Sequence, residues 1–284
     1  MKFSLLTPIN LWNPDRVEQF LRCIKSVEAQ TFRDFEWVIV DDGSTQDFLW
    51  DSVLLNKNIP QVELIHKEAM ERVSAYNDAF KTAKGDWFVF LDSDDELPPD
   101  ALEIWNRYIE KSKRKLKHTE YPTKIFNCGA IYHYVDGTSS KRDPFKPIWL
   151  GAKHGHEIFG GGNIVNGTFI FHRSVYEKLG GFMPDTVKDI NTTEINYPPY
   201  PGALKPYIRD LHNNTPYDFA GYYQLEFPEL RQYFMVDHEA EPDGKIIKEL
   251  GNPWGQDFLL FYKYTRKYHS RPIKEYLYIV NPRP

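Results

Sequence analysis

The stretch KGDWFVFLDSDDELPPDALE, residues 84–103, places a short apolar run directly before a cluster of acids. Residues 86–91 are the near-continuous apolar segment that is typical of a strand covered on both faces of a parallel sheet. Crowded carboxylates repel one another and raise each other's pKa, so a cluster of this kind needs a reason. A solvated turn, a helix N-terminus and a cation site are the three interpretations for Asp92, Asp94, Asp95 and Glu96.

Strands and helices alternate on both sides of this stretch. Further strands are predicted by the apolar runs at 3–9, 35–40 and 61–66. Helices are predicted by the spacing of apolar residues at 13–30, 71–84 and 98–111, with a shorter one at 46–55. Asn13 can cap the first helix, and Pro14 suits its first position. The pattern predicts an α/β fold with a mostly parallel sheet flanked by helices, in which ligands bind at the carboxyl ends of the strands.

Beyond about residue 120 the pattern becomes less regular. We expect strands at 123–135 and within 160–172, a loop at 137–147, a helix at 174–181 and a helix at 254–269. Ser174 is expected to cap the helix at 174–181, and Gly180 to end it. We therefore divide the chain into residues 1–120 and residues 121–284.

Composition narrows the class of protein. The net charge of −5 argues against a general nucleic-acid binder, because that class has a basic excess. Cys23 and Cys128 lie far apart, which argues against a disulfide scaffold and fits a reducing compartment. No run approaches the roughly 18 apolar residues of a membrane span. We expect a cytoplasmic protein, or one that is peripheral at the inner face of a membrane through the basic segment 262–274; a solvated helix end is the alternative for that segment.

Two of the predicted strand ends carry adjacent acids. Asp92 and Asp94 are two residues apart, so on an extended chain they point to one side and offer the hard oxygen ligands that Mg²⁺ or Mn²⁺ prefers. The alternative is that Asp95, Glu96 and Asp100 simply favour the N-terminus of the next helix. In VIVDDGST, residues 38–45, Asp41 and Asp42 can accept hydrogen bonds from a base or a ribose, or can form an Asx-turn.

Five segments in order give the chain a resemblance to the family-2 glycosyltransferases with the GT-A fold. They are FSLLTPIN (3–10), SVEAQTFRDFEWVIVDDGST (26–45), ERVSAYNDAFKTAKGDWFVFLDSDDELPPDALE (71–103), GTFIFHRSVYEKLGGF (167–182) and WGQDFLLFYKY (254–264). The resemblance is dense over residues 1–110 and sparse beyond them. It implies a Rossmann-like nucleotide-sugar-binding half at 1–120. It also implies an acceptor-side half at 121–284, with an insert at 183–253 and a C-terminal helix.

The resemblance also implies roles for single residues. Thr7, Pro8 and Asn10 match the strand end that lines the nucleotide pocket, and Asp42, with Asp41, matches the carboxylate that reads the base, usually uracil. Arg72 lies near the diphosphate-contacting segment, but the family's frequent ARN is AYN here, with Tyr76 in the Arg position. The remaining matches are Asp92 and Ser93 beside the ribose, Asp94 with Asp92 at the metal, and Asp257 as the catalytic base.

The activity that the resemblance implies is metal-dependent, inverting transfer of a sugar. The donor is a nucleotide-diphosphate sugar, expected to be a UDP-sugar, and the acceptor is a hydroxyl of a glycan or lipid-linked glycan in surface polysaccharide biosynthesis. Mn²⁺ or Mg²⁺ is the expected cofactor. A sugar-nucleotide nucleotidyltransferase is one alternative, although the strand end TPINLWNPD lacks a Gly-rich phosphate loop. A non-catalytic sugar-nucleotide-binding assembly partner is the other. The insert is expected to form an acceptor wall or lid, or else an oligomer contact.

Overall fold

The computed structural model describes residues 1–46, 58–67, 72–115, 123–144, 166–182 and 270–282, together with the single positions 260, 264 and 268. The chain divides into two compact units. The first comprises Met1–Trp149, Val165–Gly181 and Tyr264–Pro284, and all described residues except Phe182 and Leu260 belong to it. The fold below is that of the first unit.

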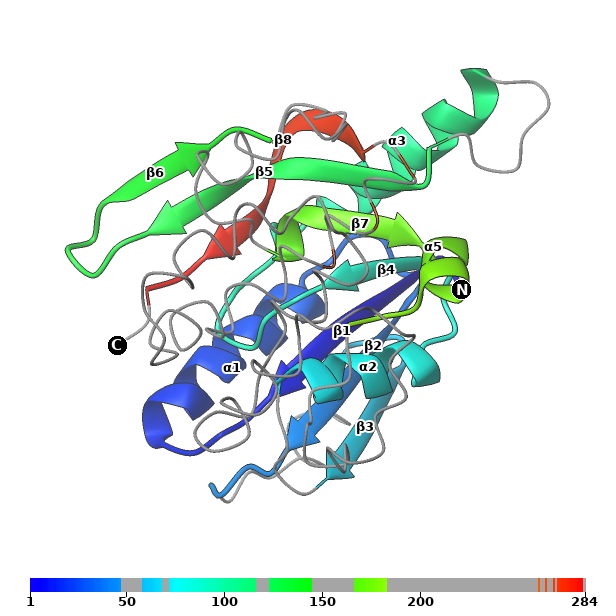
Figure 1. Ribbon diagram of the computed structural model, residues 1–284. Helices are drawn as coiled ribbons and strands as arrows, with labels where there is room; N and C mark the ends of the chain where they lie inside the picture. Colours follow the sequence, from blue (N-terminus) through cyan, green and yellow to red (C-terminus); the bar gives the residue numbers. More distant parts are fainter. Residues whose placement is uncertain are drawn as a thin grey trace, which may run out of the picture. The chain divides into compact units, whose positions relative to one another are not determined.

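A parallel layer of four strands forms the N-terminal part of the sheet (Figure 1). It contains β1 (Phe3–Ile9), β2 (Phe35–Asp42), β3 (Val62–Lys67) and β4 (Trp87–Phe90), in the order β3-β2-β1-β4. Leu5 of β1 pairs with Trp37 on one side and with Val89 on the other, and all three side chains are fully buried. Because these strands are parallel, their carboxyl ends lie at the same edge of the sheet, as the sequence predicted.

The sheet continues past β4 with strands of mixed direction. These are β5 (Ile125–His133), β6 (Ser139–Arg142), β7 (Phe169–His172) and β8 (Ser270–Val280). β7 is antiparallel to both β4 and β5, β6 is antiparallel to β5, and β8 is parallel to β5. The predicted α/β fold with a helix-flanked sheet is confirmed, and its parallel character is concentrated in the N-terminal half.

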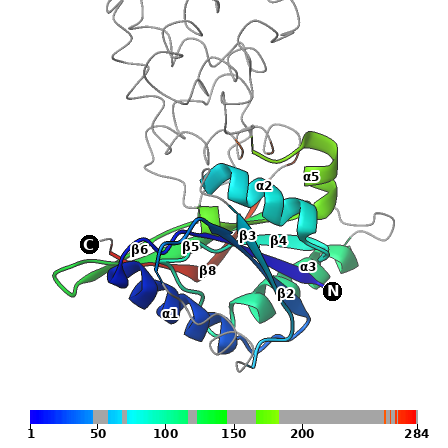
Figure 2. The same ribbon diagram turned by 90° about the horizontal axis from the view of Figure 1, so that it is seen from below.

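Helices cover both faces of this sheet (Figure 2). α1 (Pro14–Glu28) and α3 (Ala101–Lys115) lie on one face, whereas α2 (Arg72–Thr82) and α5 (Arg173–Leu179) lie on the other. On the first face Phe20 and Trp105 belong to the main hydrophobic core. On the second face Phe80 stacks on Tyr176, with ring centroids 4.8 Å apart. The Asn13 side chain accepts from the Arg16 N–H at 2.9 Å and Pro14 opens α1, so the predicted cap is confirmed.

The structure corrects three local predictions. The predicted loop at 137–147 contains β6, which pairs with β5 through a short hairpin. The cap of α5 is His172, whose side chain accepts from the Ser174 N–H, whereas Gly180 ends the helix with a φ of 75° as expected. Residues 270–280 form a strand and not a solvated helix end. Of the predicted helix at 254–269, Leu260 and Tyr264 are helical and most other residues lie outside the described part, as does nearly all of the helix predicted at 46–55.

Two expectations from composition can be compared with the described residues. Cys23 and Cys128 are buried free thiols, and burial raises the pKa of Cys128 to about 12. Such a thiol is protonated at neutral pH and behaves as a small apolar side chain. Among the described helices, none has the length and apolarity needed to cross a membrane.

Candidate active site

The predicted strand ends meet at one edge of the sheet. Ile9 at the end of β1 pairs with Asp41 of β2, and Asp41 pairs in turn with His66 of β3. On the other side of β1, the N–H of Leu91, just beyond β4, donates to the Leu6 carbonyl at 3.0 Å. The residues that follow β1, β2 and β4 therefore leave the sheet at neighbouring points.

Residues Asp92–Glu96, which we call the acidic turn, follow β4. The Asp95 N–H donates to the Asp92 carbonyl at 3.1 Å and closes the turn. This turn brings oxygens of Asp92, Asp94 and Asp95 within 4.8 Å of one another, a grouping that the described part of the chain shows only here. All three residues are buried, with exposed fractions of 8%, 4% and 2%.

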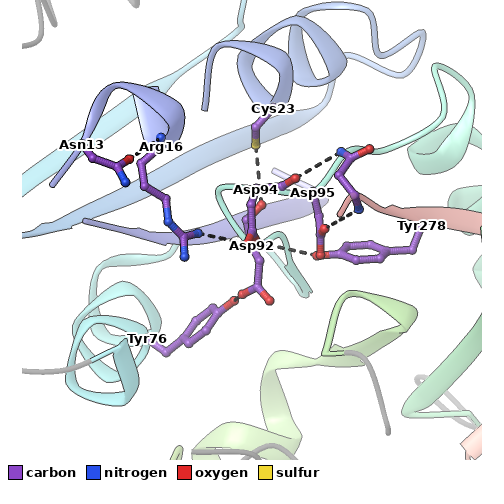
Figure 3. A network of polar contacts seen from close by, with 9 residues as sticks. Asn13, Arg16, Cys23, Tyr76, Asp92, Asp94, Asp95 and Tyr278 are labelled. Atoms are coloured by element: carbon purple, nitrogen blue, oxygen red, sulfur yellow. Dashed lines mark hydrogen bonds and ion pairs between the residues drawn. The ribbon is translucent and has the colours of Figure 1, made fainter. Parts of the chain in front are cut away.

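Two helices on opposite faces of the sheet each supply a donor to this turn (Figure 3). The Tyr76 hydroxyl of α2 donates to Asp92 Oδ1 at 2.6 Å, and Tyr76 is fully buried. The Arg16 guanidinium, in the first turns of α1, lies 3.1 Å from Asp94 Oδ2. Tyr76 thus occupies the position where the resemblance places an Arg, and it contacts a carboxylate.

Burial and mutual repulsion dominate the electrostatics of the turn. The pKa of Asp95 is raised well above its ordinary value, first by burial and then by the charges of Asp94 and Asp92. Burial, followed by the charges of Asp95 and Asp92, also raises the pKa of the Tyr278 hydroxyl. Three buried carboxylates close together form the hard-oxygen donor set that Mg²⁺ and Mn²⁺ prefer, so these residues fit a divalent cation.

The second acidic strand end forms an Asx-turn. Asp41 Oδ1 accepts from the Ser44 N–H at 3.0 Å and from the Ser44 hydroxyl at 2.5 Å, while Gly43 has a φ of 78°. Asp41 Oδ2 lies 2.9 Å from His66 Nδ1. Asp41 therefore forms the Asx-turn that was the alternative interpretation of this motif, and its carboxylate shapes that turn. Asp42 is its buried neighbour.

The end of β1 is joined to this turn. The Asn10 side chain donates to the Asp42 carbonyl at 2.9 Å, and Asn10 itself is exposed. Thr7 is fully buried, and its hydroxyl accepts from Trp37 Nε1 at 2.8 Å. Pro8 lies inside β1, in register with Val40. Of these residues, Asn10 is the one that the fold leaves open to solvent.

The structure brings some of the predicted site residues together and leaves others outside its description. Asp92, Ser93 and Asp94 share the acidic turn. The backbone of Arg72 opens α2, but its side chain and the whole of Asp257 lie outside the described residues.

Sequence reasoning missed several residues that contact the turn. Asp95 was assigned to a helix start, yet α3 begins only at Ala101 and the Asp95 carboxylate belongs to the cluster. Arg16 could have been found, because α1 begins right after the exit of β1. Tyr278 and Asn281 carried no local signal, since one lies in β8, a strand that the sequence did not predict, and the other lies one residue past it.

A helix-flanked α/β sheet with an acidic turn at the end of its fourth strand defines the GT-A class of fold. A sequence model described as "Glycosyl transferase family 2" matches residues 15–180, which is more than half of the chain. The chain belongs to this family.

Individual relatives are similar over shorter spans. An uncharacterized glycosyltransferase of Rickettsia conorii is 33% identical over 120 residues, which cover 42% of this chain and 19% of the relative. The O-antigen biosynthesis protein RfbC of Myxococcus xanthus is 32% identical over 134 residues, which cover 41% and 9%. A chondroitin synthase of Escherichia coli is 40% identical over 84 residues, which cover 30% and 12%. The matched region thus spans a fifth or less of these relatives.

The fold is also similar to that of a solved structure. TarS of S. aureus, crystallised in complex with UDP-GlcNAc, superposes with a TM-score of 0.58 over 100% of this chain and 59% of that chain. The sequences are 13% identical, so this likeness concerns the fold.

Proposed function

We propose that the chain transfers one sugar from a UDP-sugar to a hydroxyl of a glycan or lipid-linked glycan, with inversion, in polysaccharide biosynthesis. The acidic turn is the observation that carries the proposal, because three buried carboxylates at the end of a parallel strand suit a metal–diphosphate. Relatives named for O-antigen biosynthesis and chondroitin synthesis support the setting. The UDP-GlcNAc bound to TarS supports the donor class.

In this proposal the turn holds Mn²⁺ or Mg²⁺. Asp94 and Asp92 are the ligands that the resemblance implies, and Asp95 offers a third carboxylate beside them. A divalent cation supplies Lewis-acid neutralisation of the negative charge on a departing diphosphate. The buried surroundings of the turn exclude water from these charges and strengthen their interactions.

The other proposed roles follow the strand ends. Asp42 binds the base and the Asp41 turn fixes its backbone, while Asp92 and Ser93 lie beside the ribose and Arg72 near the diphosphate. Thr7, Pro8 and Asn10 shape the nucleotide pocket. Asp257 takes the proton of the acceptor hydroxyl, because direct displacement at the anomeric carbon needs one base and no protein nucleophile.

Larger assignments are also part of the proposal. Residues 1–120 bind the donor, residues 121–284 form the acceptor side, and the insert at 183–253 forms an acceptor wall or lid. A peripheral contact with an anionic membrane would use cations of segment 262–274, among which Lys274 is exposed on β8.

A panel of nucleotide sugars tests the donor and the metal together. A ligand at about 100 times its Kd stabilises the folded state by about 2.7 kcal/mol, so the right UDP-sugar with Mn²⁺ raises the melting temperature measurably. Asp94→Asn should abolish this shift. Asp34→Asn is the matched control, since Asp34 precedes β2 at the opposite edge of the sheet and its side chain is 63% exposed. A panel without any Mn²⁺-dependent shift would contradict the proposal.

The catalytic role of Asp257 needs a separate measurement. Asp257→Asn should keep Mn²⁺-dependent donor binding and lose sugar transfer, because it removes the base and spares the acidic turn. Transfer at the wild-type rate would show that another group accepts the proton. A wild-type chain that binds the donor but transfers nothing to any glycan acceptor would favour the non-catalytic binder.

A further inference from the structure

The end of β8 is paired with the acidic turn. Ile279 and Glu96 exchange two backbone hydrogen bonds, of 3.1 and 2.9 Å, in an isolated antiparallel bridge. One residue past the strand, the N–H of Asn281 donates to Asp95 Oδ1 at 3.0 Å. The backbone of the chain's C-terminal segment therefore fixes both the main chain of the turn and one of its carboxylates.

The Asn281 side chain adds two further bonds to the same turn. Its Nδ2 group donates to the Asp94 carbonyl at 3.1 Å and to Glu96 Oε1 at 2.9 Å, and the residue is 8% exposed. An amide supplies these donors without adding a charge. Asn281 thus contacts three successive acidic residues of the turn.

Tyr278, within β8, also contacts the turn. Its hydroxyl accepts from the Asp92 N–H at 3.1 Å and hydrogen-bonds the Asp95 carboxylate, and the residue is fully buried (Figure 3). A Cβ atom built on Gly167 would overlap the Tyr278 ring, so a glycine before β7 leaves the space that the ring fills. The backbone around Tyr278 is shaped to hold this phenol.

We propose that Tyr278 and Asn281 are positioning residues of the donor site, which hold the acidic turn in the shape that binds a metal–nucleotide diphosphate. The inference rests on the proposed function and adds the C-terminal segment to its site. Like charges within 4.8 Å of one another push the turn open unless neutral donors fix it. A turn that is already in its binding shape loses less conformational freedom when the ligand arrives, so its affinity is higher.

Mn²⁺ binding in the presence of UDP provides the test. The free ion is counted by its electron paramagnetic resonance signal, which requires no catalytic turnover. Tyr278→Phe removes the hydroxyl and keeps the ring, and Asn281→Ala keeps the backbone donor to Asp95 and removes the amide. Each should raise the Kd for Mn²⁺ roughly tenfold or more, the usual effect of losing a partner that orients a metal ligand.

Tyr276→Phe is the matched control. Tyr276 lies two residues away on the same strand, and its hydroxyl donates to Asp143 at the surface, 2.5 Å away. This variant should bind Mn²⁺ as the wild type does. Urea unfolding of all three variants shows whether each is folded under the binding conditions, so that a change in Kd is not a loss of folded protein.

The outcomes separate the two ideas. If folded Tyr278→Phe and Asn281→Ala both bind Mn²⁺ with the wild-type Kd, the inference is overturned, and these residues only stabilise the fold. If the wild type itself binds no Mn²⁺ in the presence of UDP, the proposed function fails first. If Tyr278→Phe and Asn281→Ala bind Mn²⁺ more weakly than the wild type and Tyr276→Phe does not, the C-terminal end of β8 belongs to the donor site.

Discussion

Asp95→Asn should stabilise the metal-free chain at neutral pH, although it replaces a residue of the candidate site. Asp95 is 2% exposed and shares its surroundings with Asp92 and Asp94. Asparagine has nearly the same shape, and its carbonyl oxygen can still accept from the Asn281 N–H. The substitution therefore removes the charge and keeps the hydrogen bond.

The magnitude follows from the separation of the carboxylates. Two unit charges 4.8 Å apart repel by about 3 kcal/mol at an effective dielectric constant of about 20. The Arg16 guanidinium, 3.1 Å from Asp94, offsets part of this repulsion. Because its pKa is raised, Asp95 can also take up a proton, which reduces the repulsion further. We expect a net gain of about 1–3 kcal/mol, or roughly 2–5 °C in melting temperature.

The sign of the pH dependence can be tested in the same experiment. The folded-state pKa of Asp95 lies above its ordinary value of 3.8, so the folded chain binds a proton that the unfolded chain has already released. Stability therefore falls as pH rises from about 4 through that raised pKa. Asp95→Asn should flatten this slope, with a gain that is largest near pH 7.5 and absent below about pH 4.

Urea unfolding in EDTA at several pH values measures this effect, with Asp34→Asn as the control for a surface charge. Asp95→Asn should also weaken Mn²⁺ binding in the presence of UDP, because the third carboxylate is lost. A variant that is no more stable than the wild type at pH 7.5 would refute the reasoning that the turn is electrostatically strained.

Two further predictions concern His172 and Tyr76. Burial, followed by the charges of Lys124 and Arg173, lowers the pKa of His172 from 6.5 to about 4, so the free energy of unfolding should decrease as pH falls through this window. His172→Asn can still cap α5 and should lose less stability between pH 7 and pH 5 in urea unfolding. An unchanged pH dependence would contradict this. Tyr76→Phe keeps the edge-on contact with Phe90 but removes the donor to Asp92, so it should lower the free energy of unfolding by roughly 1.5–3 kcal/mol in urea at pH 7.5. In the control Tyr134→Phe, which removes an exposed hydroxyl, the loss should be at most about 0.5 kcal/mol. Equal losses would contradict a stabilising role for the buried bond.

Local patterns predicted the N-terminal half of the fold because its strands and helices are specified by residues within each element. Residues 87–91 are fully buried, and the start of α1 is specified by Asn13, which caps its own helix, and by Pro14 at its first position. β8 differs, since it includes Pro272, Lys274 and Glu275 and begins within the basic segment. Its strand conformation depends on pairing with β5, more than 100 residues earlier in the chain, which no local window contains. The polar β6 likewise depends on its hairpin partner.

The same distinction applies to the candidate site. The spacing of Asp92 and Asp94 at a strand end was enough to predict that they lie together. Asp95 was misassigned because an extended chain points it away, whereas the hydrogen bond from its N–H to the Asp92 carbonyl bends the chain and turns it inward. The bond between Arg16 and Asp94 joins residues 78 apart, and that between Asn281 and Asp95 joins residues 186 apart. Such contacts follow from the sheet topology, which the sequence specified only in part.

The tyrosine at position 76 is consistent with an intact site. The Arg16 guanidinium lies 3.1 Å from Asp94 Oδ2 and so brings one positive charge to the three carboxylates of the turn. An arginine at position 76, in contact with Asp92, would add a second positive charge, whereas the Tyr76 hydroxyl holds the Asp92 carboxylate at 2.6 Å and adds none. The departure from the family's pattern therefore fixes the Asp92 carboxylate without adding a positive charge to the turn, which suits the cation site proposed above.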